Sequence, residues 1–276
     1  MEVRTEKLEI RTTEMPNTAT YLFCVIAAAR RPRVPAKTRP LPGLGPVRIL
    51  DVGGGTYLVV ADAPLSRYSE DAINRGLADL EWVSRAAVAH ESVIESFVGE
   101  TAILPMKLFT IFTSDVRALE HIAQQRSRIA SLVKRVANNQ EWGVRLVLDR
   151  TAAERVSASS IGKGRAAASA GVSGAAYLTR KKAQRNAAVE LASRARDIVA
   201  GLYDRLEARS KLAKRRAASE LPVKGGPLLL DAAFLVPKAR AASFKALAAR
   251  EARGLSRQGY AMSVTGPWPP YTFVQE

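Results

Sequence analysis

The amino-acid sequence predicts an α+β fold of two consecutive ferredoxin-like units, antiparallel sheets with helices packed on them, the second with a long helix and a C-terminal tail. Over 141–266, β-prone runs and helical patterns follow the order β-α-β-β-α-β, which is that of a ferredoxin-like unit. Residues 20–112 have the similar order β-β-β-α-β. The chain has 276 residues, which is long enough for two such units.

The predicted N-terminal unit, 20–112, follows a charged segment, 1–19, that we expect to be a mobile tail. The apolar run 20–28 predicts a buried strand, and 101–108 predicts the closing strand. Five prolines in 30–46 predict an extended loop where a ferredoxin-like unit has its first helix. This unit therefore follows the ferredoxin-like plan with one helix replaced.

A hairpin and a helix complete this unit. The β-prone runs 47–52 and 56–63 are joined by three glycines, as is typical of a hairpin. Either Ser69 or Asp71 can cap a helix that runs to about Phe97. The apolar positions expected on one stripe of this helix are Ile73, Leu77, Leu80, Val83 and Val88.

A connecting helix is predicted over 113–140, because apolar residues recur at helical spacing after the capping residue Ser114. The C-terminal ferredoxin-like unit then spans 141–276. The small-residue stretch 157–175 predicts a mobile linker. The strands of this unit are expected at 141–149, 220–225, 227–237 and 259–266, and its helices at 174–218 and 239–253.

The C-terminal tail, 265–276, is unusually apolar and rich in proline for a chain end. We expect it to continue the last strand. The side chains of Trp268, Tyr271 and Phe273 are expected to pack on the protein's own surface, where three aromatic residues can bury roughly 450–750 Å². The tail is therefore predicted to be a clamp rather than a peptide ligand.

The sequence contains no recognisable catalytic, cofactor or metal motif, and we expect a protein that is not an enzyme. His90 and His121 lie inside predicted helices, and neither has a second histidine or a cysteine at a ligand-like spacing. The single cysteine, Cys24, lies in a predicted core strand and is consistent with a reducing cytoplasm. Neither 51–56 nor 161–165 matches a nucleotide-binding loop. No apolar run approaches the roughly 20 residues of a membrane span.

The net charge of +16 comes entirely from residues 113–276, since 1–112 contain 13 basic and 13 acidic residues. The basic helix predicted over 180–216 holds twelve Lys and Arg against four acidic residues. Such a segment binds an acidic or amphipathic protein partner, or the phosphates of nucleic acid. The strands lack the stacking aromatic residues of RNA-binding sheets, which makes nucleic acid the less favoured partner. The proposed contact residues are Arg180, Lys181, Lys182, Arg185, Arg194, Arg205 and Arg209.

Several motifs together resemble the gas-vesicle accessory proteins of the GvpF/GvpL family. They occur in the family's order, at 21–28, 90–97, 103–114, 141–149, 173–185, 231–237 and 265–274. One position departs from the pattern. Many members have Phe-Gly at the end of the Leu-Pro segment, and this chain has Leu108 and Phe109 there.

The resemblance implies two ferredoxin-like domains and a non-enzymatic role in building gas vesicles. It also implies a cytoplasmic protein, associated with vesicles, that binds the hydrophobic shell subunit GvpA or other accessory proteins. Two other functions stay open: an RNA- or DNA-binding module that uses the basic 180–216 helix, and a tandem ferredoxin-like protein with a haem or a small oxidoreductase site. His90 and His121 are the only histidines available as haem ligands, and neither has a supporting motif.

Overall fold

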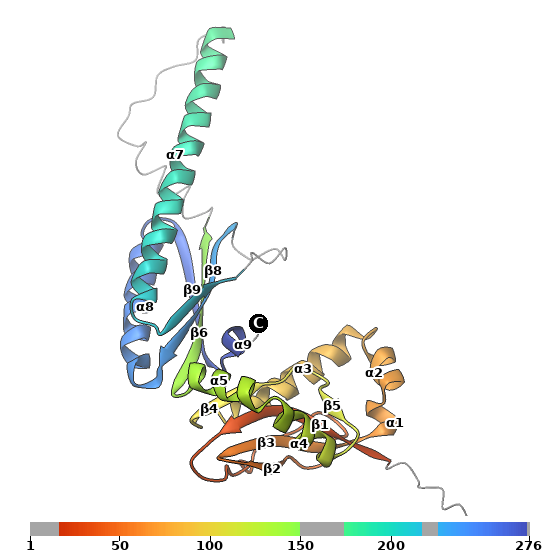
Figure 1. Ribbon diagram of the computed structural model, residues 1–276. Helices are drawn as coiled ribbons and strands as arrows, with labels where there is room; N and C mark the ends of the chain where they lie inside the picture. Colours follow the sequence, from red (N-terminus) through yellow and green to blue (C-terminus); the bar gives the residue numbers. More distant parts are fainter. Residues whose placement is uncertain (1–16, 150–173, 217–225, 275–276) are drawn as a thin grey trace, which may run out of the picture. The chain divides into compact units, whose positions relative to one another are not determined.

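The computed structural model describes residues 17–149, 174–216 and 226–274 of the chain (Figure 1). These residues form two antiparallel sheets that carry helices, which confirms the α+β class. The predicted tail 1–19 and linker 157–175, and the predicted strand 220–225, lie wholly or almost wholly outside the described residues.

The first sheet has the strand order β2-β3-β1-β4, and β5 also pairs with β1. Its strands are β1 (Thr18–Ala27), β2 (Arg48–Gly53), β3 (Thr56–Pro64), β4 (Ala102–Pro105) and β5 (Ile111–Phe112). The hairpin prediction is confirmed: Asp51 of β2 faces Tyr57 of β3, and Gly53, Gly54 and Gly55 all have positive φ. In chain order this arrangement is the ferredoxin-like one, with a loop between β1 and β2 where a helix would be.

Strand β1 is buried on both faces because helices pack on both sides of it. Side chains alternate along a strand, so Thr20 and Tyr21 point to opposite faces. The Thr20 hydroxyl donates a hydrogen bond to Asp115 of α4 (Asp115–Gln124), and the Tyr21 hydroxyl bonds His90 of α3 (Leu80–Glu95). Eight consecutive residues of β1, from Ala19 to Ile26, are therefore buried.

The predicted helix from Ser69 to Phe97 is broken, and this prediction was wrong. Helices α1 (Leu65–Tyr68), α2 (Glu70–Gly76) and α3 replace it. Ser69 caps α2, and the Asp79 carboxylate caps α3 by accepting from the backbone N–H groups of Glu81 and Trp82.

The break changes which residues face the core. The helical phase restarts at Asp79, so residues before and after the break do not share a stripe. Of the predicted stripe, Leu77 is 52% exposed, Leu80 82% and Val88 66%. The buried face of α3 consists instead of Ala86, His90, Val93 and Ile94.

The predicted connecting helix is interrupted at Gln125, where α4 ends and α5 (Arg126–Val136) begins. Ser114 caps α4 as predicted, since its side chain accepts a hydrogen bond from the backbone N–H of Arg117. Helix α4 is also tied to the first sheet. Arg48 of β2 donates two hydrogen bonds to Asp115, of 2.6 and 2.8 Å, and one of 2.6 Å to Asp62.

This ion pair predicts a loss of stability in acid. The hydrogen bonds from Arg48, with that from Thr20, lower the pKa of Asp115 below its ordinary value of 3.8. A carboxylate with a lowered pKa stabilises the fold above the pKa of the unfolded chain, and this contribution disappears as the pH falls below it. Asp115→Asn should cost about 1 kcal/mol at pH 7, because the pair is partly exposed. The melting temperature of this variant should also decline less than that of the wild type between pH 4 and 2.5. Parallel curves of melting temperature against pH would contradict this assignment.

The second sheet has the order β7-β8-β6-β9, which in chain order is that of a ferredoxin-like fold. Its strands are β6 (Asn139–Leu148), β7 (Leu212–Arg215), β8 (Leu228–Pro237) and β9 (Tyr260–Trp268). Helices α7 (Gly174–Glu207) and α8 (Ala241–Ser256) lie together on one face, as Figure 1 shows. Leu202, Leu206 and Phe244 pack there against Trp142 and Phe234. The predicted order β-α-β-β-α-β is confirmed.

The predicted helix 174–218 ends earlier than expected, at Glu207, and residues 212–215 form strand β7. The sequence there is rich in helix formers, but pairing with β8 outweighs this local preference. The backbone N–H of Lys211 donates to Leu235, and that of Arg216 donates to Asp231. The basic residues from Lys211 to Arg216 therefore lie beyond the helix.

Contacts divide the chain into two compact units, which we call the N-terminal and C-terminal units. The N-terminal unit runs to Phe97 and adds Met106–Ile129. The C-terminal unit comprises Val98–Pro105 and the chain from Ala130 onward. The domain boundaries expected from the sequence, at residues 112 and 140, stay a proposal.

Candidate functional site

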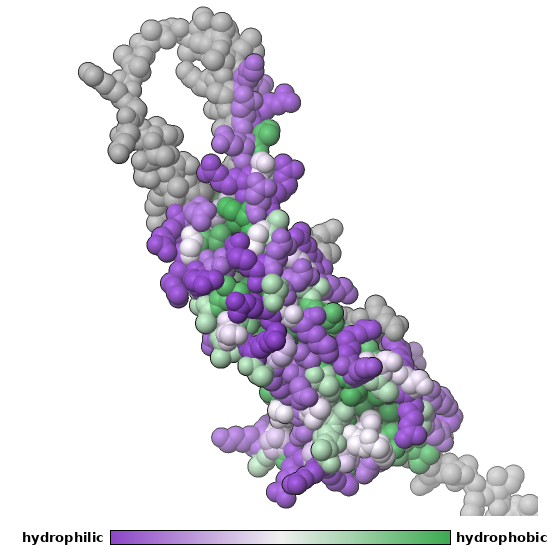
Figure 2. All heavy atoms as spheres, turned by 60° about the vertical axis from the view of Figure 1, so that its left-hand side comes forward, coloured by the Kyte–Doolittle hydropathy of each residue, from purple (hydrophilic) through white to green (hydrophobic). Residues whose placement is uncertain are grey.

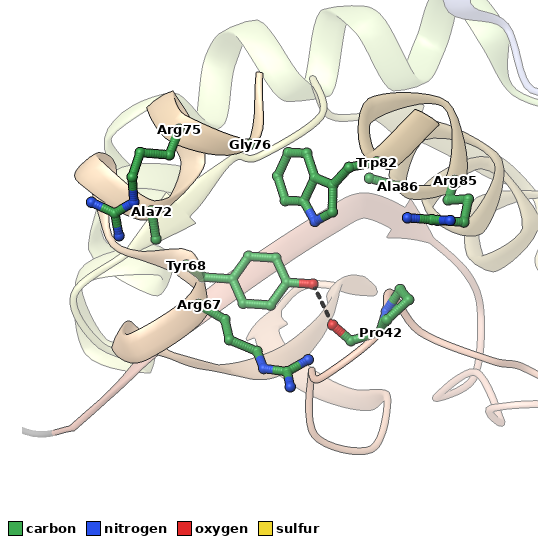
Figure 3. Close-up of a pocket in the computed structure, with 9 residues that line it drawn as sticks. All are labelled: Pro42, Arg67, Tyr68, Ala72, Arg75, Gly76, Trp82, Arg85 and Ala86. Carbon is green, nitrogen blue, oxygen red and sulfur yellow. Dashed lines mark hydrogen bonds between the residues drawn. The ribbon is translucent and has the colours of Figure 1, made fainter. Parts of the chain in front are cut away.

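The main candidate site is a surface pocket of about 510 Å³ in the N-terminal unit (Figure 3). In the view of Figure 3 the ring of Trp82 lies above that of Tyr68. Arg67 lies below Tyr68 with its guanidinium toward Pro42, Arg85 lies to the right, and Arg75 lies to the left with its guanidinium turned away from the two rings. The pocket is formed where α1, α2 and α3 meet the proline-rich loop. Its lining residues are Pro42, Arg67, Tyr68, Ala72, Arg75, Gly76, Trp82, Arg85 and Ala86.

The helix break that the sequence analysis missed is what creates this pocket. A Cβ atom at Gly76 would lie 2.7 Å from the Trp82 ring, so only glycine allows the indole to lie against the end of α2. The other side of the indole is stacked on Phe109, with ring centroids 5.1 Å apart and planes 14° apart. Trp82 is therefore held between a glycine and an aromatic ring.

The pocket is cationic. Arg67, Arg75 and Arg85 line it, and no acidic residue does so among the residues that the structure describes. Arg85 forms an exposed ion pair with Glu81 on the same helix. The structure shows no carboxylate partner for Arg67 or Arg75 within its described part. Two guanidinium groups are thus available to an incoming anion.

Two of the lining side chains are held in place by the proline-rich loop. The Tyr68 hydroxyl donates a hydrogen bond of 2.9 Å to the carbonyl oxygen of Pro42. Gly43 has a φ of +89°, and a Cβ there would lie 2.9 Å from Cδ of Arg67. The stem of Arg67 therefore packs closely against a glycine, which limits its movement.

A chain of hydrogen bonds supports the loop that carries Phe109. The carbonyl oxygen of Met106 accepts from Nε2 of His90 at 3.1 Å, so the proton of the neutral imidazole lies on Nε2. Nδ1 then accepts from the Tyr21 hydroxyl at 2.8 Å, and that hydroxyl accepts from the backbone N–H of Phe109 at 3.1 Å. Burial lowers the pKa of His90 and raises the pKa of Tyr21. His90 has the structural role that the sequence suggested.

A second cavity, of about 450 Å³, is lined mainly by apolar side chains and shares Tyr68 with the first. Its apolar lining residues include Ile73, Phe109, Ile111 and Phe112. Cys24 is fully buried in the core, and burial raises the pKa of its thiol. Among the described residues, no three His, Cys, Asp or Glu side chains are grouped closely enough to hold a metal ion.

The predicted basic contact residues lie on and just after α7, and Figure 2 shows a mostly hydrophilic surface over this helix. Lys181, Lys182 and Arg185 are exposed near its N-terminal end. Arg205 is paired with Glu251 of α8 at 2.9 Å. Arg194 and Arg209 are also exposed. The side chain of Arg180 is not among those that the structure describes. Their role in partner binding stays a prediction.

The C-terminal tail turns into a short helix, α9 (Tyr271–Val274), after β9 ends at Trp268. Phe273 is 6% exposed, whereas Trp268 is 37% exposed and is less buried than the sequence suggested. The tail is held by Thr272, whose N–H and hydroxyl both donate to the buried carboxylate of Glu141, at 2.8 and 2.6 Å. Tyr271 is half-buried. The contribution of the tail to partner binding is untested.

Glu141 lies on the face of the second sheet opposite α7 and α8. Burial raises its pKa, and the two hydrogen bonds from Thr272 oppose this shift. On the same face, Asp231 accepts from Arg145 at 3.0 Å and from Arg216 at 2.9 Å. The short helix at the chain end thus supplies two hydrogen bonds to a buried carboxylate that also forms an ion pair with Arg216 at 4.0 Å.

The fold defines the chain as a tandem ferredoxin-like protein with a cationic pocket. The family model for "Gas vesicle synthesis protein GvpL/GvpF" matches residues 19–275, and the chain belongs to this family. Gas vesicle protein L of Streptomyces sp. (strain CB03234) is 29% identical over 250 residues, covering 87% of this chain and 91% of that protein. Gas vesicle protein F of the same strain is 26% identical over 263 residues, covering 93% of this chain and 100% of that protein.

Two solved structures share the fold. The crystal structure of GvpF from Anabaena sp. PCC7120 matches with a TM-score of 0.64 and 16% identity, over 94% of this chain and 97% of that one. The crystal structure of GvpF from Microcystis aeruginosa matches with a TM-score of 0.59 and 15% identity, over 94% of this chain and 99% of that one. In the described part of the chain, no helix is both long and apolar enough to cross a bilayer.

The departure at Phe109 has a structural consequence. This residue has a φ of +62°, in the region where glycine is favoured. A side chain in this conformation costs about 1–2 kcal/mol. In return, the Phe109 ring stacks on Trp82, which lines the cationic pocket, and itself lines the second, mainly apolar cavity.

Two substitutions at Phe109 separate strain from stacking. We expect Phe109→Gly to change the free energy of unfolding by less than about 1 kcal/mol, because relief of strain offsets the lost aromatic pair. Phe109→Ala keeps the strain and loses the ring, so it should cost about 2 kcal/mol. Urea unfolding measures both, and acrylamide quenching should reach Trp82 more easily in both variants. Equal stability of the two variants would contradict the assignment of strain.

Proposed function

We propose that this chain is a non-enzymatic accessory protein of gas-vesicle assembly, which binds the shell subunit GvpA or other accessory proteins as vesicles nucleate. The observation that carries the proposal is the family match over residues 19–275. The site of action that we propose is the cytoplasm and the growing vesicle.

The N-terminal unit supports a binding role. It has two neighbouring surface cavities, one cationic and one mainly apolar, and Tyr68 lines both. Leu77, which directly follows α2, is 52% exposed, and Leu80, the first residue of α3, is 82% exposed. A partner with apolar side chains would cover these leucines, and a shell subunit that is very hydrophobic has such side chains.

Co-expression with GvpA and affinity purification of the tagged chain test this function. We expect GvpA to be recovered with the wild-type chain and to be lost when Leu77 and Leu80 are both replaced by Ser. The matched control is Val116→Ser, since Val116 is 61% exposed on α4 and lies outside both cavities. Recovery of no vesicle protein under mild conditions would count against the proposal.

The exposed basic residues of α7 favour nucleic acid as the alternative partner. Affinity for nucleic acid falls by nearly one power of the salt concentration for each phosphate contact. A titration of generic single-stranded RNA at several salt concentrations therefore distinguishes the two functions. We expect no saturable binding at 150 mM salt. Tight binding with a steep salt dependence, removed by Lys181→Gln with Arg185→Gln, would support the alternative.

A further inference from the structure

The cationic pocket has a composition that recognises one kind of chemical group. Arginine is a planar fork that binds a carboxylate through two parallel hydrogen bonds. Arg67 and Arg75 have no carboxylate partner in the described part of the chain, although the first 112 residues contain equal numbers of acidic and basic residues. Three arginines thus line one pocket, although residues 1–112 as a whole carry no net charge. An anion in this pocket would pair with arginines that have no carboxylate partner within the described part of the chain.

The pocket is also preformed, which lowers the cost of binding. The Trp82 ring is held between Gly76 and Phe109, the Tyr68 hydroxyl is bonded to Pro42, and the stem of Arg67 packs against Gly43. Side chains that are already ordered lose less entropy when a ligand arrives. A volume of about 510 Å³ is within the range of small-ligand pockets and can hold a carboxylate side chain with an apolar neighbour.

The apolar surroundings indicate a polypeptide rather than a free anion or a nucleic acid. Two aromatic rings form walls of the pocket, and two exposed leucines lie close to it in the sequence: Leu77 directly follows α2, and Leu80 is the first residue of α3. A free inorganic anion would use none of this surface. A nucleic acid is attracted by an extended basic field, and the neutral N-terminal half does not supply one.

We propose that this pocket binds an acidic segment of a partner polypeptide, with one Glu or Asp carboxylate at Arg67, another at Arg75, and an apolar side chain between them against Trp82 and Tyr68. Arg85, which already pairs with Glu81, lies at a third side and adds to the positive potential. That the occupant is a protein rests on the proposed function; that the pocket takes a carboxylate rests on the pocket alone.

The test uses the full chain and a fluorescently labelled, capped peptide, acetyl-Leu-Glu-Phe-Glu-Leu-Glu-amide, in a fluorescence polarisation titration. The companion peptide has Gln in place of each Glu. We expect the Glu peptide to bind at least tenfold more tightly than the Gln peptide. Arg67→Gln with Arg75→Gln should weaken binding of the Glu peptide at least tenfold, and Arg33→Gln with Arg117→Gln, the same change of charge at exposed sites outside the pocket, should leave it unchanged.

A second variant tests the pocket without removing its arginines, so that a loss of binding is not confused with a loss of folding. Ala72→Glu places a carboxylate in the pocket and leaves all three arginines in the chain, and it should abolish binding of the peptide while far-UV circular dichroism stays that of the wild type. Equal affinity for the Glu and Gln peptides would overturn the proposal. Equal weakening by the pocket and control pairs, or displacement of the peptide by equimolar acetate or phosphate, would also overturn it, as would displacement by RNA at micromolar nucleotide.

The outcome is distinguishable from that of the proposed function. If the peptide fails to bind but GvpA is still recovered with the wild-type chain, the pocket inference is wrong and the vesicle function stands. If the peptide binds with the expected pattern and no vesicle protein is recovered, the carboxylate site stands and the proposed function is wrong.

Discussion

Replacing Tyr21 with phenylalanine is expected to lower the free energy of unfolding of the N-terminal unit by about 3 kcal/mol, at roughly 1–3 kcal/mol for each buried group that loses its partner. The Tyr21 hydroxyl is both the acceptor for the backbone N–H of Phe109 and the donor to Nδ1 of His90. Phenylalanine keeps the ring in the core and removes both bonds. Tyr21 is fully buried, so water does not replace them.

The measurement is urea unfolding followed by the fluorescence of Trp82. The other two tryptophans, Trp142 and Trp268, are replaced by Phe in this background, so that the signal reports the N-terminal unit. The control is Tyr57→Phe, which makes the same chemical change on the adjacent strand β3, outside this network. A loss for Tyr21→Phe no larger than that of the control would show that the hydrogen-bond chain is not a source of stability.

The same network predicts a pH dependence. The pKa of His90 is lowered below its ordinary value of 6.5 by burial, so the unfolded chain takes up a proton at a pH where the folded chain does not. Stability is therefore highest above pH 6.5 and declines as the pH falls below it. The N-terminal unit of the wild type should lose stability between pH 6.5 and 5. His90→Gln should be less stable than the wild type at pH 7, and its free energy of unfolding should be nearly constant over this interval. A decline as steep as that of the wild type would contradict the assignment.

Deleting residues 267–276 is expected to lower the free energy of unfolding of the C-terminal unit by about 4 kcal/mol. Loss of the buried Phe273 side chain contributes roughly 1.5–3 kcal/mol. Loss of hydrogen bonds to the Glu141 carboxylate contributes roughly 1.5–3 kcal/mol more. Glu141 would then remain 3% exposed on the sheet without its donors from Thr272.

Point substitutions separate these contributions. Thr272→Val removes the hydroxyl donor and keeps the backbone N–H, so it should cost about 1–2 kcal/mol. Thr272→Ser keeps the hydroxyl and is the matched control. Because the pKa of Glu141 is raised, its protonated form stabilises the fold at low pH, and this stability is lost as the pH rises through that pKa. Removal of the hydrogen bonds from Thr272 raises the pKa of Glu141 further. The deletion should therefore lower the free energy of unfolding more at pH 7 than at pH 4. An unchanged melting temperature after the deletion would contradict the prediction that the tail stabilises the unit.

Much of the fold could be predicted because its strands have strong local signals. The run 20–28 is apolar throughout, as a strand with helices on both faces must be, and β1 is buried accordingly. The hairpin between β2 and β3 follows from three consecutive glycines, all of which have positive φ. In the C-terminal unit, the alternation of strands and helices predicted the ferredoxin-like order, but its second strand lies at 212–215, where a helix was predicted.

The errors occurred where tertiary contacts outweigh local preference. Residues 212–215 have a helix-forming composition, but the edge of β8 offers hydrogen bonds that a helix extension would leave unused. The break after Gly76 was missed because apolar residues continue at helical spacing on both sides of it. Gly76 and the capping residue Asp79 were the available signals, and they would have revealed a helix end and a new helix start.

The pocket could not be predicted for the same reason. Its arginines lie 8 and 10 residues apart in the sequence and come together only when the break folds α2 back toward α3. The stacking of Phe109 on Trp82 depends on a left-handed backbone conformation that the residue type itself disfavours. The basic residues that stood out in the sequence are the ones on and after α7, where an Arg-rich composition is visible without a fold.

The central claim, that this chain takes part in gas-vesicle assembly by binding a vesicle protein, is tested most directly by vesicle yield. A complete set of vesicle genes is expressed in a heterologous host with and without the gene for this chain, and vesicles are counted by electron microscopy of whole cells. Few or no vesicles are expected without the chain, restoration with the wild type, and poor restoration with Ala72→Glu. A vesicle count that does not change when the chain is omitted would contradict the claim.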